Sequence, residues 1–152
     1  MTATLYDERL SVPLRWWVQG VMFLATVWIA VILWVPEAMA WAITAALVGL
    51  FVLAMLGYGS ARIVVDAAGL RAGRARIEAV HLGAAEPLSA EDTWQVAGPR
   101  ADARAYLVLR PYLRRAVRIE ITDPADPTPY WLVSTRHPES LAAAIAGLAG
   151  AR

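Results

Sequence analysis

The chain has 152 residues, of which 59% are hydrophobic, and a formal net charge of +1. The hydrophobic fraction exceeds the roughly 45–50% of soluble globular proteins, and so small a net charge supplies no global field that attracts nucleic acid. Because the chain contains no cysteine, disulfides, thiolate metal sites and cysteine nucleophiles are excluded.

Four charged residues and a proline lead directly into a tryptophan pair, in the stretch "YDERLSVPLRWW". Pro13 disfavours regular structure before the pair, so residues 6–12 are expected to be extended. Two roles stay open for Asp7, Glu8 and Arg9. They dock on a soluble domain, or they belong to a solvated tail.

Two long apolar runs follow, at residues 16–35 and 38–58. At about 1.5 Å of rise per residue, a helix over the first run covers roughly 30 Å, the thickness of a bilayer's hydrocarbon core. Pro36 lies between the runs and disfavours one continuous helix. The sequence therefore predicts a transmembrane helical hairpin over residues 16–58.

A cleaved signal peptide is the main alternative for the first run. Residues 38–40, Ala-Met-Ala, have the small-x-small form of a cleavage site. The run is longer than the usual signal core of about 7–15 residues, and Asp7 and Glu8 precede it where a signal is basic. These features favour the hairpin.

Interfacial residues are expected at both ends of the hairpin, because arginine reaches headgroups and tryptophan prefers the membrane–water interface. The predicted membrane-interface anchors are Arg15, Trp16, Trp17, Trp34 and Trp41. The second run also carries small residues at spacings of three and four, which favour close packing against the first run, against a partner membrane protein or against a second copy of the chain. These small residues are Ala38, Ala42, Ala45, Ala46 and Gly49.

Arginine placement predicts the orientation of the hairpin. Arg9 and Arg15 precede the first run, four arginines (62, 71, 74 and 76) follow the second, and the turn carries none. The positive-inside rule therefore predicts a two-pass protein of the cell membrane with both termini in the cytoplasm. Residues 1–15 are then a cytoplasmic juxtamembrane segment, and residues 60–152 a cytoplasmic domain.

The rest of the chain has the patterning of a small β-rich domain. Strands are expected at 62–66, within 67–82, and at 105–111, 116–122 and 129–135, and a short helix at 88–98 with Ser89 as its N-cap. A helix over residues 137–150 has Pro138 in its first turn and apolar residues on one face. We therefore predict an α+β fold, mainly antiparallel, closed by a C-terminal amphipathic helix.

Three stretches carry a family resemblance: "YDERLSVPLRWW", "ARAYLVLRPY" and "DPADPTPYWLVSTRHPESLAAAI". The chain resembles an actinobacterial family of uncharacterised, alanine-rich, two-pass membrane proteins, a domain-of-unknown-function family. The resemblance covers nearly the whole chain and implies no activity. The layout is also similar to bacterial membrane proteins that carry a pleckstrin-homology-like (PH-like) domain, which implies a binding or scaffolding module.

Catalytic and metal-binding patterns are weak in this sequence. His81 and His137 lie in different elements, and Ser134 lacks the G-x-S-x-G frame of a nucleophile elbow. No catalytic residue, metal site or cofactor is therefore predicted. An enzyme that acts on a lipid-linked substrate is only the third hypothesis.

The clearest binding signal is a cluster of arginines around one tyrosine, which we expect on a single β-hairpin. Cationic side chains beside an aromatic anchor suit anionic headgroups. The candidate lipid- or partner-binding residues are Arg110, Tyr112, Arg114, Arg115 and Arg118. A solvated hairpin whose arginines pair with acidic neighbours such as Glu120 stays open as the alternative.

These observations favour a membrane-anchored, non-catalytic binding or scaffolding module. Its partners are expected to be the lipid bilayer and either anionic lipid headgroups or another membrane protein, and no nucleic acid. The alternative is a structural accessory subunit of a larger membrane complex.

Overall fold

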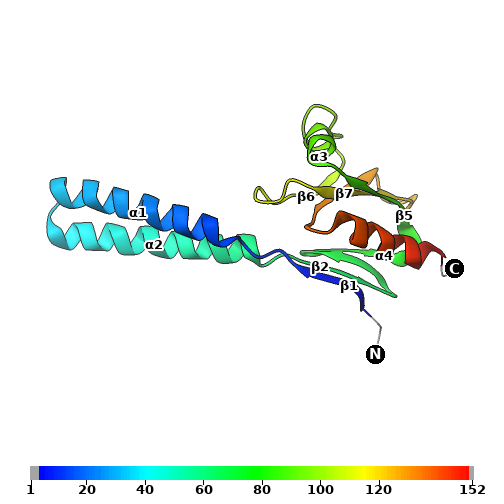
Figure 1. Cartoon of the computed structure of the whole chain (residues 1–152), viewed down its shortest axis with the longest axis horizontal. Helices are drawn as coiled ribbons and strands as arrows, with labels where there is room; N and C mark the ends of the chain where they lie inside the picture. The colour runs from blue at the N-terminus through cyan, green and yellow to red at the C-terminus, as the bar shows by residue number, and fades with distance from the viewer. Residues whose placement is uncertain (1–3, 151–152) are drawn as a thin grey trace. The chain divides into compact units, whose positions relative to one another are not determined.

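The computed structural model describes residues 4–150, so the outermost residues of the predicted terminal segments, 1–3 and 151–152, lie outside it. The chain divides into two compact units (Figure 1). One is a helical hairpin, Ser11–Ser60. The other, here called the α+β domain, combines the residues up to Leu10 with those from Ala61 onward.

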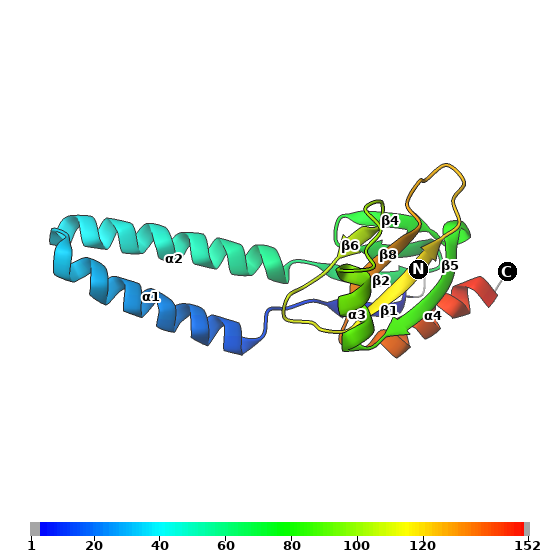
Figure 2. The ribbon, with the colours of Figure 1, turned by 90° about the horizontal axis from the view of Figure 1, so that it is seen from above.

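The hairpin consists of α1 (Leu14–Trp34) and α2 (Glu37–Gly59), which lie side by side and antiparallel (Figures 1 and 2). The chain leaves the helical conformation at Val35 and Pro36, whose backbones are extended. Both helices are long and apolar enough to cross a membrane. The two predicted apolar helices are therefore confirmed, with ends shifted by one or two residues.

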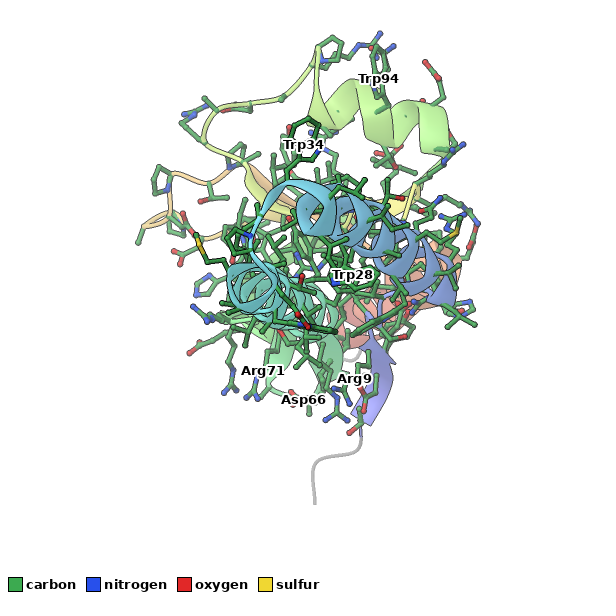
Figure 3. All side chains as sticks on the ribbon, turned by 90° about the vertical axis from the view of Figure 1, so that its left-hand side faces the viewer. Arg9, Trp28, Trp34, Asp66, Arg71 and Trp94 are labelled. Carbon is green, nitrogen blue, oxygen red and sulfur yellow. The ribbon has the colours of Figure 1, made fainter. Side chains whose placement is uncertain are left out.

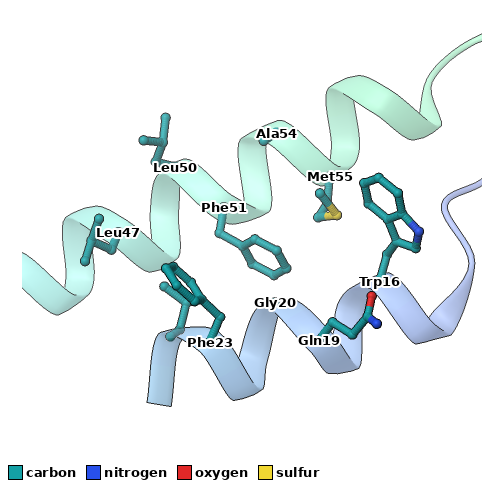
Figure 4. Close-up of a pocket in the computed structure, with 10 residues that line it drawn as sticks. Trp16, Gln19, Gly20, Phe23, Leu47, Leu50, Phe51, Ala54 and Met55 are labelled. Atoms are coloured by element: carbon teal, nitrogen blue, oxygen red, sulfur yellow. The ribbon is translucent and has the colours of Figure 1, made fainter. Parts of the chain in front are cut away.

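The hairpin packs around Gly20 of α1 and Phe51 of α2 (Figure 4). A Cβ at Gly20 would lie 2.2 Å from two carbons of the Phe51 ring, so only glycine leaves room for that ring. Trp17 adds an edge-on contact, with its ring centroid 5.7 Å from that of Phe51.

The small residues of α2 do not form this seam. A Cβ at Gly49 would meet no atom within 4 Å, and the four alanines of the predicted set are exposed. Their expected packing against α1 is therefore wrong. The reason is that the bulky Phe51 and the buried Ala40 and Met55 fill the space between the helices.

The first sheet of the α+β domain is antiparallel, with its strands in chain order (Figure 1). These strands are β1 (Thr4–Arg9), β2 (Arg62–Asp66), β3 (Gly69–Ala72) and β4 (Ala75–Glu78). β1 precedes the hairpin and β2 follows it, and Leu10 is fully buried with its amide donating to the Ala61 carbonyl at 2.9 Å. Residues 7–9 therefore dock on the folded domain as part of β1, which is one of the two roles left open for them. The compact domain is accordingly larger than the predicted residues 60–152.

The β2–β3 turn needs glycine at position 69. Gly69 has a φ of +139°, and a Cβ there would lie 2.0 Å from the carbonyl oxygen of Ile77. Gly73, in the next turn, has a φ of +63° but open space around it. Both positions therefore favour glycine for its backbone conformation, and position 69 also requires it because a neighbouring strand leaves no room for a side chain.

The second sheet has the strand order β5-β7-β8-β6. A 3₁₀ turn (Ala79–His81) leads into it, and its strands are β5 (Leu82–Leu88), β6 (Tyr106–Val108), β7 (Ala116–Ile121) and β8 (Tyr130–Ser134). Between β5 and β6 lies α3 (Ala90–Ala97), where the Ser89 hydroxyl accepts from the Asp92 amide as the predicted N-cap.

The core lies among the two sheets and the C-terminal helix α4 (Pro138–Gly150), which contacts β5 and β7 of one sheet and β1 and β2 of the other. Apolar side chains of β2, β7, β8 and α4 supply much of this core, and Leu148 of α4 packs at its edge. Among those fully or almost fully buried are Ile63, Val65, Val117, Ile119, Ile121, Leu132, Leu141 and Ile145. The α+β fold with a closing C-terminal helix is thus confirmed.

Candidate functional site

The predicted arginine hairpin does not exist as a hairpin. β6 pairs with β8, in parallel, and β7 pairs with the opposite edge of β8. The segment 109–115 therefore passes across the end of β8 instead of making a tight turn. Sequence spacing suggested a hairpin because two short strands lie close in the chain, but β8 takes the place between them.

Tyr112 anchors this connecting segment to the domain. Its ring is buried, its hydroxyl donates to the Leu10 carbonyl at 2.8 Å, and burial raises its pKa. A turn closed by the Leu113 amide and the Arg110 carbonyl surrounds it. Tyr112 therefore holds the segment in place, and a ligand would contact the neighbouring side chains rather than the Tyr112 ring.

Two of the predicted arginines already have partners inside the domain. Arg115 forms an ion pair with Glu139 at the start of α4. The Arg118 guanidinium lies 4.7 Å from the centroid of the Tyr130 ring, a cation–π contact. An external ligand would have to compete with these contacts to bind either guanidinium.

Arg110 and Arg114 instead line a groove of about 540 Å³ beside α3, together with Trp94. We call this the α3 groove. Within residues 4–150, neither arginine lies within ion-pair distance of a carboxylate. The Nε of Arg110 is enclosed and has no hydrogen-bond partner, while its Nη1 donates to the Leu109 carbonyl at 3.2 Å.

The remaining lining of the α3 groove is mostly apolar, with one acidic group. Trp94 is 60% exposed, an unusual position for the largest side chain. Glu91 also lines the groove and accepts a hydrogen bond from Gln95 at 3.4 Å. Two guanidiniums against one carboxylate leave an excess of one positive charge, which suits an anionic group beside an apolar one.

The predicted interface anchors lie near the ends of the two helices. Arg15, Trp16 and Trp17 are in the first turn of α1, and Trp34 is its last residue, 89% exposed (Figure 3). Trp41 is in the second turn of α2, where its ring centroid lies 6.0 Å from that of Trp28. Their role at a membrane interface stays a prediction.

Sequence reasoning missed a buried cluster centred on Glu8, which we call the Glu8 cluster. Its Oε2 accepts from the Tyr6 hydroxyl at 2.7 Å and from the Thr135 hydroxyl, and its Oε1 accepts from the Arg136 amide at 3.1 Å. The Arg136 guanidinium lies 3.6 Å from the same oxygen. Burial is the main cause that raises the pKa of Tyr6 to about 12.

The Glu8 cluster joins β1 to the chain just before α4, and both segments belong to stretches that carry the family resemblance. That coincidence was the signal available in the sequence. The cluster contains no histidine or metal-ligand set, and among residues 4–150 no group of three His, Asp or Glu side chains could hold a metal ion. Its chemistry is that of a polar clamp.

Comparison with known proteins gave one match. A family model described as "Protein of unknown function (DUF3093)" matches residues 5–145, which is most of the chain. No curated protein and no solved structure matches it. The matched region includes the hairpin, the Glu8 cluster and the α3 groove.

Proposed function

The chain belongs to this family of proteins of unknown function, and we propose from its own geometry that it is a membrane-anchored, non-catalytic scaffolding module. The hairpin anchors it, and the α3 groove binds an acidic segment of a protein partner. The observation that carries the proposal is the groove itself, where Trp94 lies beside two arginines that have no carboxylate partner among residues 4–150.

Membrane anchoring is supported by the exposure of the hairpin. The most apolar 18-residue stretch of α1 has a mean hydropathy of 1.9, and none of it is buried within the protein. The corresponding stretch of α2 has a mean hydropathy of 2.3, and 11% of it is buried. A soluble protein buries such helices in its core, since exposing this much apolar surface to water is costly. At about 1.5 Å per residue, the 21 residues of α1 reach roughly 31 Å, enough to cross the hydrocarbon core.

The arginine distribution supports a cytoplasmic α+β domain. Arginines lie just before α1 and just after α2, whereas the only charged residue at the α1–α2 turn is Glu37. The positive-inside rule places such arginines in the cytoplasm. A reporter enzyme that is active only outside the membrane, fused after Arg152, should be silent, whereas the same reporter inserted at the α1–α2 turn should be active. Activity of the C-terminal fusion would overturn this orientation.

The chemistry of the α3 groove favours a protein partner over a bare headgroup. Tryptophan and arginine are the residue types most enriched at the energetic centres of protein interfaces. The groove also offers apolar surface from Leu109, Leu113 and Ala97, which a phosphate headgroup does not use. An acidic segment with one or two apolar side chains matches both parts of the lining.

The test titrates the full-length protein, in nanodiscs of neutral lipid, with two libraries of short peptides. One is rich in glutamate, leucine and phenylalanine, and the other has glutamine in place of glutamate. We expect selection from the acidic library alone. Arg110→Gln combined with Arg114→Gln should weaken the selected peptides about tenfold, at about 0.7 kcal/mol for each arginine.

The matched control removes the same charge elsewhere. Arg100→Gln combined with Arg104→Gln should leave binding unchanged, because those side chains do not line the groove. If a soluble short-chain phosphatidylglycerol binds instead of the peptides, the groove is a headgroup site. If neither binds, the groove recognises nothing acidic, and the accessory-subunit hypothesis takes precedence.

A further inference from the structure

The outer face of the first sheet is rich in arginine. Side chains alternate across each strand, so the residues facing away from the core are exposed while their neighbours are buried. Four arginines lie on this face and a fifth in the β3–β4 turn. We call this set the arginine face: Arg9, Arg62, Arg71, Arg74 and Arg76, all exposed.

The charges on this sheet are separated along the strands. β1 enters α1 at its Arg9 end, and β2 follows α2 at its Arg62 end, opposite Arg9 in the register. The half of the sheet at these ends carries the five arginines against two carboxylates, Asp7 and the buried Glu8, a net charge of +3. The opposite strand ends carry Asp66 and Glu78, a net charge of −2.

Most of the arginine face has no counter-charge within the domain. Asp7 forms an ion pair with Arg62. In the part of the chain that the structure describes, no carboxylate lies within ion-pair distance of the other four arginines. Their positive charge is therefore open to a partner outside the molecule.

Arg71 and Arg76 are direct cross-strand partners on β3 and β4. Like charges directly opposite each other destabilise a sheet, so this pair is a cost that the isolated fold does not recover. An external anionic surface removes that cost, because it places a counter-charge beside both guanidiniums at once.

We infer that the arginine face docks on the anionic lipid leaflet next to the hairpin. The inference rests on the membrane anchoring proposed above and concerns a different surface from the α3 groove. Figures 1 and 3 place α3, with Trp94, on the opposite side of the α+β domain from this sheet. Docking by the arginine face thus turns the groove toward the cytoplasm, where a protein partner reaches it.

A leaflet is the occupant that the charges favour. A face with four arginines and little acidic compensation suits a laterally extended negative surface, to which each arginine contributes separately. The strand ends that carry the excess positive charge are also the ends joined to the two apolar helices, by four residues on one side and two on the other. The short links to the membrane-spanning helices therefore hold this face near the leaflet, whereas a soluble partner would have to reach it by diffusion.

The test follows the distance of this face from the lipid headgroups in the full-length protein. Because the chain has no cysteine, Val64→Cys gives one labelling site at the centre of the arginine face, and Ala103→Cys gives a control site in the loop after α3. Each variant is labelled with a fluorophore and placed in nanodiscs with spin-labelled headgroups. The lipid is either neutral phosphatidylcholine or phosphatidylcholine with 30% phosphatidylglycerol.

Quenching at position 64 should rise in the anionic nanodiscs and fall again at 0.5 M salt, while quenching at position 103 stays low. Arg71→Gln combined with Arg76→Gln should weaken docking about 30-fold, from about 1 kcal/mol for each arginine and 1.4 kcal/mol per tenfold. Arg100→Gln combined with Arg104→Gln, which removes the same charge, should leave docking unchanged. The Arg71/Arg76 variant should unfold at the same or a higher temperature than the wild type, since the like-charge pair is gone.

Equal quenching at position 64 in neutral and anionic nanodiscs would overturn the inference, as would equal effects of the two double variants. Those results leave membrane anchoring intact, because the chain is still held in the nanodisc. Failure of the chain to enter nanodiscs at all refutes the anchoring as well, so the two failures are told apart by co-purification with lipid.

Discussion

Replacing Glu8 by glutamine tests whether the Glu8 cluster holds β1 in the α+β domain. Glu8 is 8% exposed, and its carboxylate contacts donors: two hydroxyls, one backbone amide and one guanidinium. Glutamine keeps the shape but replaces one acceptor oxygen by an NH₂ group. On the Oε1 side that group faces the Arg136 amide, a donor, and on the Oε2 side the two hydroxyls must turn to accept from it, and in both orientations the negative charge beside the Arg136 guanidinium is lost.

The size of the effect follows from these contacts. A hydrogen bond to a charged group contributes about 1.5–3 kcal/mol, and an unsatisfied buried group costs about 1–3 kcal/mol. The Arg136 side chain is 35% exposed, so water screens part of the lost ion pair. We expect Glu8→Gln to lower the free energy of unfolding by about 2–4 kcal/mol. For a domain of this size, that is a fall in the unfolding midpoint of roughly 10–30 °C.

The assay is thermal unfolding of the full chain in detergent micelles, followed by near-ultraviolet circular dichroism. This signal includes the buried Trp131 and Tyr130 of the domain along with the hairpin tryptophans, whereas the hairpin helices dominate the far-ultraviolet signal. Asp7→Asn is the matched control, because Asp7 is the adjacent residue on β1 but forms its ion pair at the surface.

A second substitution separates the network from general strain. Thr135→Val removes one donor to Glu8, so the double variant should lose at least about 1 kcal/mol less than the sum of the two single variants. The reasoning is refuted if Glu8→Gln unfolds at the temperature of Asp7→Asn, or if the two cluster substitutions are additive.

Three further experiments test other parts of the structure. The pKa of Tyr6 is raised to about 12 in the folded domain. The unfolded chain therefore loses this proton near pH 10 while the folded one keeps it, and stability should fall between pH 10 and 12. In Tyr6→Phe, pH titration of the unfolding midpoint should show a smaller fall. Gly69→Ala should destabilise the domain by about 3 kcal/mol or more, because alanine has an unfavourable φ there and its Cβ also clashes with a neighbouring strand. Gly73→Ala should cost only about 1–2 kcal/mol, because its Cβ meets no neighbour. Equal midpoints of urea unfolding for the two variants would contradict this. Gly20→Leu should separate the two helices, measured by energy transfer across the hairpin, whereas Gly49→Leu should not.

The sequence determined the features that depend on short stretches of chain. The two apolar helices follow from run length and hydropathy, and the Pro36 break from the missing backbone donor. The inward positions of Val117, Ile119 and Ile121 follow from strand alternation, and the start of α3 from the Ser89 cap. Each of these is decided by residues within a few positions of one another, so no tertiary information is needed.

Tertiary structure alone decided which distant segments meet. β1 and β2 are separated in the sequence by the whole hairpin, and their pairing buries Leu10 and Glu8, which read in the sequence as part of a polar tail. Likewise β8, which comes last among the strands, separates β6 from β7, so the arginines predicted on one hairpin are divided between an ion pair, a ring contact and the α3 groove. Local patterns report what each segment buries but not against what. The partner is chosen by the fit of the whole domain, in which a long-range pairing repays its loop-closure entropy only after the core has formed.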